Sequence, residues 1–170
     1  GDFRNFLKPS TKKSLFSIRN AFDGILEIIG KQIFYLNIKL SINYQFNKDE
    51  FVIFGYENEF KQVLLNIINN AKTKIIEKNK NDDFNGEILI NVSKDIRKDF
   101  NIITIIDNAG EISPDIIGSI FDPYFTTKED GTGVGLYMAK VIIEDKMLGH
   151  IDVLNCNNSV MFTIKLPFKK

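Results

Sequence analysis

The sequence predicts an α/β two-layer sandwich, built as one domain behind a short N-terminal segment. Apolar residues recur in steps of three and four over some stretches and in steps of two over others, which are the periods of helices and of strands. The predicted elements follow the order helix, strands, helix, strands, helix, strands, which favours a two-layer sandwich over a doubly wound sheet. A length of 170 residues is enough for one domain of ordinary size.

Composition and charge exclude several classes of function. Lys and Arg together number 22, Asp and Glu also number 22, and the pI is about 6.8. Nucleic-acid-binding domains need a clustered cationic surface, so we expect no nucleic-acid partner. No run approaches the ~18 consecutive apolar residues of a membrane span, and residues 1–5 do not resemble a signal segment. The lone Cys156 forms no internal disulfide and belongs to no zinc-binding cluster, which predicts a reducing cytoplasmic setting.

The N-terminal third contains a predicted linker, one helix and a strand pair. Residues 1–14 are basic and interrupted by Pro9 and Ser10, as expected for the end of a preceding element followed by a linker. Residues 38–46 alternate in polarity and residues 51–54 follow a polar turn, so these two segments are predicted to pair as strands. Between the linker and the strands, apolar residues occur at helical spacing: Ile18, Phe22, Ile25, Leu26, Ile29 and Ile33.

Residues 57–78 form the clearest predicted helix. Its apolar stripe contains Phe60, Val63, Leu64, Ile67, Ile68, Ala71 and Ile75. A polar stripe beside it contains Gln62, Asn66 and Asn70 at four-residue intervals. Asn is a poor helix former because its amide competes for backbone hydrogen bonds. Helix propensity therefore does not explain Asn66 and Asn70, which become candidates for a functional role.

The remaining elements enclose a glycine-rich loop. Four more strands are predicted, at residues 87–93, 100–107, 151–155 and 160–166. The second of these is almost continuously apolar, as expected for a central strand. Ser113 and Pro114 begin a short predicted helix that reaches Ile120. Residues 131–135 form the glycine-rich loop, which opens onto a helix with an apolar face of Leu136, Ala139, Ile143 and Met147.

Three features are candidates for chemistry, and each has an ordinary structural alternative. Glycines at 131–135 let backbone N–H groups approach phosphate oxygens, but Leu136 stands where a Rossmann fingerprint requires glycine, and the alternative is a mobile structural loop. Asp107, at the end of a predicted buried strand, can accept a hydrogen bond from an exocyclic amine such as that of adenine, or can cap the turn. Asn66 and Asn70 can complete a Mg²⁺ shell of waters and phosphate oxygens, or belong to a solvated helix face.

Four motifs, in this order, resemble the nucleotide-binding boxes of sensor histidine kinases. They are NIINNA at 66–71 (N box), DNAG at 107–110 (first glycine box), FDPYFTTK at 121–128 (F box) and GTGVGL at 131–136 (second glycine box). The match extends over residues 18–166. The resemblance implies the Bergerat fold, a mixed and mostly antiparallel sheet with helices on one face, which is shared with gyrase, mismatch-repair ATPases and related chaperones.

The resemblance also implies a cofactor, a metal and roles for individual residues. The domain would bind ATP with Mg²⁺, which Asn70 would coordinate with Asn66 assisting, and Asp107 would accept the adenine amine. Lys128 would act with Asn70 in catalysis, from a mobile lid over the phosphates that the two F-box phenylalanines anchor; alternatively, these rings are core aromatics. The residues implied to contact the nucleotide are Asn66, Asn70, Lys74, Asp107, Ala109, Ile112, Phe121, Phe125, Thr126, Thr127, Lys128, Gly131, Thr132, Gly133, Val134, Gly135 and Leu136.

One position distinguishes kinases from hydrolases among proteins that resemble this chain. The ATPase branches place a Glu one turn before the magnesium Asn, as general base for the attacking water. Here that position is Asn66. Without the carboxylate, water activation loses a contribution of roughly 10²–10⁴-fold. The resemblance therefore favours phosphoryl transfer to a supplied acceptor over hydrolysis.

The phosphoacceptor expected in such a kinase is missing. The single histidine, His150, lies at a predicted turn entering a strand and resembles a substituted glycine of the family. Residues 3–9 resemble the end of a dimerisation domain, so residues 1–16 are expected to be its tail and linker and residues 17–170 the catalytic domain. We expect this chain to be monomeric and the full-length kinase to be a homodimer, with this domain in the cytoplasm and an anchor in the inner membrane. Its partners would be its own dimerisation domain and a response-regulator receiver domain.

Two departures from the family pattern affect the first glycine box. Ala109 and Glu111 stand at its two glycine positions. The Glu111 carboxylate is expected to face the ATP phosphates, to occupy a position that favours positive φ, and so to weaken nucleotide affinity. An alternative function is a degenerate nucleotide-binding regulatory module with weak or no kinase activity. A serine kinase of the anti-sigma type is disfavoured by Asn66 and the F box.

Overall fold

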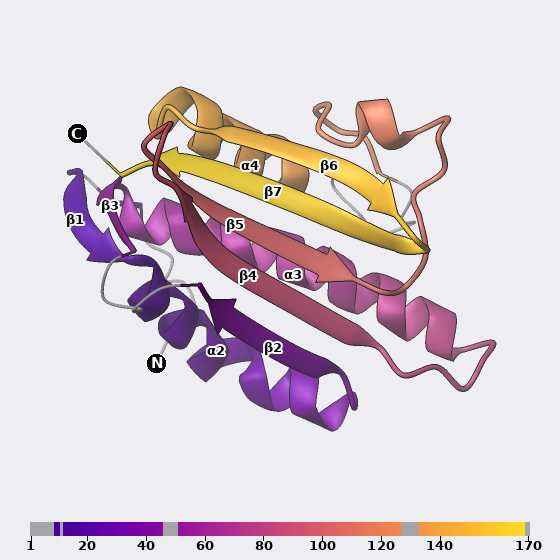
Figure 1. Ribbon diagram of the computed structural model, residues 1–170. Coiled ribbons are helices and arrows are strands. Elements are labelled where there is room, and N and C mark those ends of the chain that lie inside the picture. Colours follow the sequence, from indigo (N-terminus) through magenta and orange to yellow (C-terminus); the bar gives the residue numbers. More distant parts are fainter. Residues whose placement is uncertain (1–8, 11, 46–50, 127–132, 169–170) are drawn as a thin grey trace.

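The computed structural model describes residues 9–10, 12–45, 51–126 and 133–168, which form two layers (Figure 1). One layer is a five-stranded sheet in the order β2-β4-β5-β7-β6. Its strands are β2 (Lys39–Tyr44), β4 (Glu87–Asp95), β5 (Phe100–Asp107), β6 (His150–Cys156) and β7 (Ser159–Pro167). The β2–β4 pair is parallel and the other three pairs are antiparallel. The predicted two-layer α/β sandwich with a mixed, mostly antiparallel sheet is confirmed.

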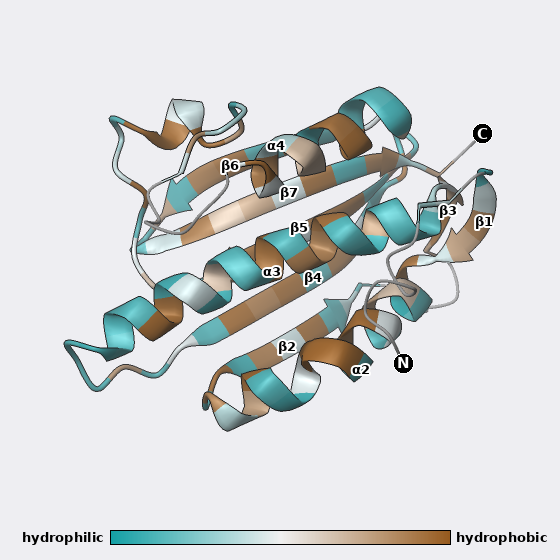
Figure 2. Cartoon of the chain, turned by 180° about the vertical axis from the view of Figure 1, so that it is seen from behind, coloured by the Kyte–Doolittle hydropathy of each residue, from teal (hydrophilic) through white to brown (hydrophobic). Residues whose placement is uncertain are grey.

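The second layer consists of helices on one face of the sheet. They are α2 (Ile18–Tyr35), α3 (Glu57–Asn79) and α4 (Gly135–Lys140), the last continued by a π-helix (Val141–Lys146). Seen from the helical side, α3 crosses the sheet between α2 and α4 (Figure 2). None of the helices in the described part of the chain combines the length and apolar character needed to cross a membrane.

The core lies between the helices and the sheet. The predicted apolar stripe of α3 is buried throughout, and Ser17 caps α2 by accepting a hydrogen bond from the Asn20 N–H (3.1 Å). On β5 and β7, every second residue is buried because helices cover one sheet face only. Ile102 and Ile106, on the uncovered face of β5, are therefore only half-buried, although β5 is central as predicted.

The predicted pairing of residues 38–46 with residues 51–54 is wrong. β2 pairs with β4, and β3 (Val52–Gly55) instead forms a separate two-stranded sheet with β1 (Ser14–Ser17). The basic, linker-like composition concealed β1, of which only Phe16 is buried. The expected domain boundary between residues 16 and 17 falls within this strand.

The segment between β5 and α4 also differs from prediction. In place of an α-helix from Ser113 to Ile120, it forms a turn followed by a 3₁₀-helix (Ile117–Ser119). The Ser113 hydroxyl accepts from the Asp115 N–H (3.3 Å), two residues on, which is a turn contact and not an α-helical cap. Eight residues with one buried apolar side chain, Ile120, bury too little surface to hold an α-helix together.

Tyr44 of β2 gives a prediction about stability at high pH. Burial, and secondarily the negative charge of Asp23, raises the pKa of Tyr44 to about 12, against the opposing effect of Arg19. The folded protein therefore holds this proton more tightly than the unfolded chain, and the stability it contributes is lost as pH rises from about 10 to about 12. We expect Tyr44→Phe to lose less unfolding free energy than the unchanged protein between about pH 9 and pH 11.5, measured by urea titration.

The matched control for Tyr44 is Tyr35→Phe, because Tyr35 is exposed at the end of α2. This variant is expected to follow the unchanged protein over the same pH range. If Tyr44→Phe and the unchanged protein lost equal unfolding free energy at high pH, the raised pKa of Tyr44 would be contradicted.

Candidate functional site

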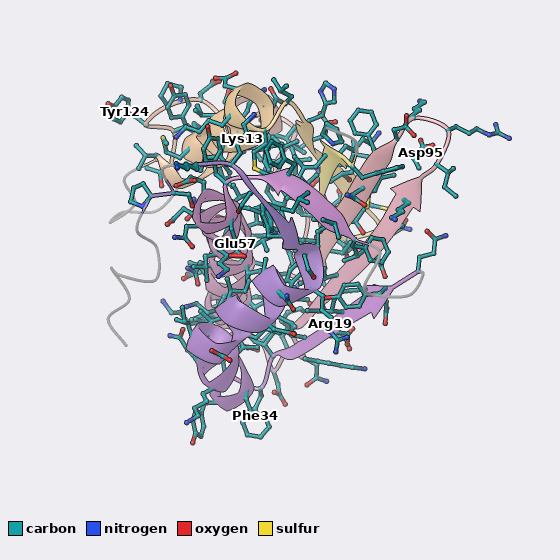
Figure 3. The ribbon with its side chains drawn as sticks, turned by 90° about the vertical axis from the view of Figure 1, so that its left-hand side faces the viewer. Lys13, Arg19, Phe34, Glu57, Asp95 and Tyr124 are labelled. Atoms are coloured by element: carbon teal, nitrogen blue, oxygen red, sulfur yellow. The ribbon has the colours of Figure 1, made fainter. Side chains whose placement is uncertain are left out.

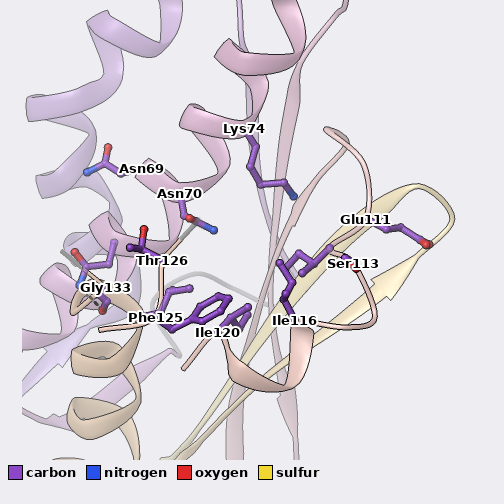
Figure 4. A pocket seen from close by; sticks show the side chains of 14 residues that line it. Asn69, Asn70, Lys74, Glu111, Ser113, Ile116, Ile120, Phe125, Thr126 and Gly133 are labelled. Atoms are coloured by element: carbon purple, nitrogen blue, oxygen red, sulfur yellow. Dashed lines mark hydrogen bonds between the residues drawn. The ribbon is translucent and has the colours of Figure 1, made fainter. Parts of the chain in front are cut away.

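A cavity of about 480 Å³ opens between α3, the segment that follows β5, and the start of α4 (Figure 4). Its lining residues come from four segments of the chain. They are Asn66, Asn69, Asn70 and Lys74 of α3; Glu111, Ile112, Ser113, Ile116 and Ile120; Phe125 and Thr126; and Gly133, Gly135 and Leu136. One wall is polar and the opposite wall is largely apolar, the composition usual for a small-molecule site.

The polar wall is the edge of α3 that the sequence singled out. Asn66, Asn70 and Lys74 follow one another at four-residue steps and all line the cavity, while the apolar stripe of the same helix packs on the sheet. In Figure 4, Asn70 and Lys74 point in the same direction, toward the segment that carries Ser113 and Ile116, and Asn69 points the opposite way. The buried stripe therefore fixes the direction in which the polar edge faces.

Asn66 fastens α3 to the start of α4. Its Oδ1 accepts a hydrogen bond from Gln62 Nε2 (3.0 Å), and its Nδ2 donates to the Gly135 carbonyl (2.9 Å). Both ends of the amide are thus engaged in protein contacts. In this arrangement Asn66 positions the backbone that opens α4, and Asn70 presents its side chain to the cavity one turn further along.

Asp107 lies at the end of β5, where the structure shows one of the two roles considered for it. Its carboxylate caps the turn, because Oδ1 accepts from the Ala109 N–H (3.1 Å). The same oxygen accepts from Lys74 Nζ (2.9 Å), which also donates to the Gly110 carbonyl (3.1 Å). Asp107 is only 3% exposed and is not part of the cavity lining, whereas Lys74 is. Lys74 therefore stands between Asp107 and the cavity.

The structure does not show the left-handed backbone expected at Glu111, and the expected loss of nucleotide affinity stays a prediction. Its Oε2 accepts from the Asn158 N–H (3.4 Å), and Figure 4 shows the side chain directed away from Asn70 and toward the β6–β7 turn. The positive φ of this segment is taken by Gly110 (+99°), so neither Ala109 nor Glu111 needs a left-handed conformation. Glu111 thus fits the turn without strain, although it lines the cavity.

Asn155 of β6 is a positioning residue that sequence reasoning missed. Its Oδ1 accepts from the Ile112 N–H (2.9 Å) and its Nδ2 donates to the Ile112 carbonyl (2.7 Å). This pair holds the segment after β5 against the sheet edge and so places Ile112 in the cavity wall. A single Asn in a strand carries no sequence signal for such a contact.

The F box meets the start of the α4 segment at a tight backbone contact. The Tyr124 N–H donates to the Gly133 carbonyl (2.9 Å), and the Tyr124 side chain is exposed at the periphery (Figure 3). Phe121 packs edge-on against Phe162 of β7, with ring centroids 6.1 Å apart, whereas Phe125 lines the cavity. Phe121 is therefore a core aromatic, and Phe125 belongs to the site.

The structure brings together only part of the predicted site. Asn66, Asn70, Lys74, Ile112, Phe125, Thr126, Gly133, Gly135 and Leu136 line the cavity, whereas Asp107, Ala109, Phe121 and Val134 do not. Four further residues lie outside the described residues: Thr127, Lys128, Gly131 and Thr132. Asn69, Ser113, Ile116 and Ile120 line the cavity without having been predicted. The apolar members of that set gave no signal, because their spacing is that of ordinary core residues.

Comparison with known proteins identifies the family. The family described as histidine kinase-, DNA gyrase B-, and HSP90-like ATPases matches residues 55–170. A protein of Rickettsia prowazekii named as an NtrY-like sensor histidine kinase is 31% identical over 136 residues, which cover 79% of this chain and 21% of the relative. The sensor histidine kinase ZraS of Salmonella typhi is 41% identical over 107 residues, covering 62% of this chain and 21% of ZraS. The chain thus spans about a fifth of the length of these curated relatives.

Solved structures agree with the sequence comparison. The nucleotide-free catalytic domain of histidine kinase ThkA superimposes with a TM-score of 0.77 at 26% identity, covering 92% of this chain and 96% of that domain. A longer ThkA structure, of which this chain covers 41%, is in complex with the response regulator protein TrrA. The chain therefore belongs to the histidine kinase-, DNA gyrase B-, and HSP90-like ATPases, as an ATP-binding catalytic domain of the kind found in sensor histidine kinases.

Proposed function

We propose that this domain binds ATP together with Mg²⁺ in the cavity and transfers the γ-phosphoryl group to a histidine on a dimerisation domain. The observation that carries the proposal is that the polar edge of α3 lines one cavity, where its Lys74 bonds Asp107 at the end of β5, in a domain of an ATP-binding family. In the transfer, the bond from the γ-phosphorus to the bridging oxygen breaks, a bond to the acceptor nitrogen forms, and ADP leaves.

The residues of the polar edge fit a magnesium site that is completed by the nucleotide. Asn70 offers a neutral amide oxygen to the cavity, the kind of hard ligand that Mg²⁺ accepts beside waters and phosphate oxygens. When bound, the ion would neutralise charge on the phosphates. Asn66 supports the site differently from the expectation, because its oxygen already accepts from Gln62. We assign it to holding Gly135 in place.

The lining of the cavity favours transfer over hydrolysis. Among the described lining residues the one carboxylate is Glu111, and it is directed toward the β6–β7 turn. Activation of a water molecule by a positioned base contributes roughly 10²–10⁴-fold to hydrolysis. Lacking a carboxylate at position 66, the site is suited to an acceptor that supplies its own nucleophile.

The partners and cellular place of the whole protein are part of the same proposal. ThkA is solved with a response regulator, and the relatives matched are much longer sensor kinases. We assign residues 1–16 to the tail of a dimerisation domain and to a linker whose last three residues begin β1. The whole protein would be a homodimeric kinase anchored in the inner membrane, with its catalytic domain in the cytoplasm. Ser10 supports this junction: its N–H donates to Glu59 Oε1 (2.7 Å) and its Oγ accepts from the Asn58 N–H (3.3 Å), which ties the linker to α3.

Calorimetric titration with ATP, with and without Mg²⁺, tests the binding step. We expect metal-dependent binding to the unchanged protein and at least about tenfold weaker binding to Asp107→Ala, which loses the acceptor for the base. Asp152→Ala is the control, because Asp152 is exposed on β6 and does not line the cavity. Absence of ATP binding by the unchanged protein would overturn the proposal.

A further inference from the structure

An ion pair closes the end of the cavity at which Asp107 is proposed to bind the adenine base. The roles assigned so far do not explain this pair. Lys74 reaches from α3 to Asp107, 33 residues along the chain, and its side chain is 24% exposed against 3% for Asp107. A ligand in the cavity therefore meets the ammonium of Lys74 before it meets the carboxylate. The wall that should present a hydrogen-bond acceptor presents a donor instead.

An ammonium and an exocyclic amine compete for the same partner. A lysine ammonium has three donors and no acceptor, and two of its donors are used by Asp107 and by the Gly110 carbonyl. The 6-amino group of adenine also donates, so it cannot bond to Lys74. Because Lys74 lies between Asp107 and the cavity, the amine reaches the carboxylate only after the ammonium has moved aside, which breaks the bond from Lys74 to Oδ1. A 6-oxo group, as in hypoxanthine or guanine, accepts from the ammonium directly.

We infer that Lys74 is a specificity-determining residue. By binding Asp107 and covering it from the cavity, Lys74 lowers the preference of this site for adenine over 6-oxopurines. The inference rests on the proposed nucleotide-binding function. The pair is a charge-assisted hydrogen bond to a buried carboxylate, so exchanging it for a neutral amine weakens ATP binding by about tenfold relative to a site with Asp107 free.

The test compares ATP with inosine triphosphate, which differs from it at purine positions 1 and 6. Dissociation constants are measured by calorimetry on the unchanged protein and on Lys74→Met, whose side chain keeps the length and loses the charge. We expect Lys74→Met to bind ATP about tenfold more tightly and inosine triphosphate no more tightly, so that the ratio of the two constants rises about tenfold. An unchanged ratio, or weaker ATP binding by Lys74→Met, would overturn the inference.

Two further variants keep the result interpretable. Lys72→Met changes a lysine of the same helix that bonds Gln32 on the surface, and it is expected to leave the ratio unchanged. If thermal unfolding shows that Lys74→Met does not fold, Lys74→Gln retains a neutral donor for Asp107 and should shift the ratio in the same direction by a smaller factor. If the unchanged protein binds neither nucleotide, the proposed function falls and this inference falls with it. If it binds both and the ratio does not respond to position 74, only this inference falls.

Discussion

Asn70→Ala is expected to reduce phosphoryl transfer by about a hundredfold or more and to remove the dependence of ATP binding on Mg²⁺. Asn70 is the amide of the polar edge that points into the cavity beside Lys74 (Figure 4). Alanine is the best helix former, and the neighbouring Ala71 and Ile67 remain buried under the sheet, so the helix itself should persist. The loss would therefore come from the site.

Measurement of the Asn70 effect needs two quantities. The rate of label transfer from γ-labelled ATP to a histidine-bearing dimerisation domain gives the catalytic loss, and calorimetry with and without Mg²⁺ gives the binding loss. Asn20→Ala is the matched control, because Asn20 is an exposed amide of α2 that does not line the cavity. A transfer rate in Asn70→Ala equal to that of the control would rule out a role for Asn70 in holding the metal.

Gly133→Ala is the second substitution with a large expected effect. Gly133 has φ +72°, and a Cβ there would lie 2.3 Å from the Tyr124 carbonyl carbon and 2.6 Å from its oxygen. Left-handed φ costs an L-residue about 1–2 kcal/mol before any clash. The backbone contact between Tyr124 and Gly133 must therefore separate, which displaces the cavity wall that Gly133 forms.

We expect Gly133→Ala to weaken ATP binding by about tenfold to a hundredfold while the core, which Gly133 does not enter, keeps its unfolding midpoint within a few degrees. Gly118→Ala is the control, since Gly118 is exposed, has no atom within 4 Å of an added Cβ and lies in the 3₁₀-helix of the same region. ATP binding by Gly133→Ala as tight as by Gly118→Ala would show that this contact does not shape the site.

The helix that carries the site, α3, could be predicted from the sequence because local periodicity of apolar residues determines it. The stripe of α3 from Phe60 to Ile75 is buried as predicted, and this burial alone sets where Asn66 and Asn70 face. Strand pairing could not be predicted in the same way, since it depends on contacts between distant segments. The strand Ser14–Ser17, with one buried residue, was concealed in a linker-like stretch, and without it β3 was assigned to the wrong partner.

Within the site, residue types were predictable and their contacts were not. Lys74 was expected to touch nucleotide, but its bond to Asp107 depends on how α3 packs over β5. Glu111 was expected to face the phosphates, but the bond that its Oε2 accepts from the Asn158 N–H depends on how the β6–β7 turn lies beside the segment after β5. In both cases the charged side chain forms its hydrogen bond with a residue that is distant in sequence. Local sequence patterns do not predict such contacts.

The central claim, that this domain phosphorylates a histidine, is tested most directly by joining it to the dimerisation domain of a related kinase such as ZraS. The chimaera is incubated with γ-labelled ATP and Mg²⁺, and the label is examined for the acid lability and alkali stability of phosphohistidine. We predict labelled histidine on the dimerisation domain, lost when that histidine is replaced. The positive control is the same dimerisation domain joined to its own catalytic domain, which does phosphorylate it. If the control is labelled and the chimaera binds ATP but is not labelled, the account is contradicted.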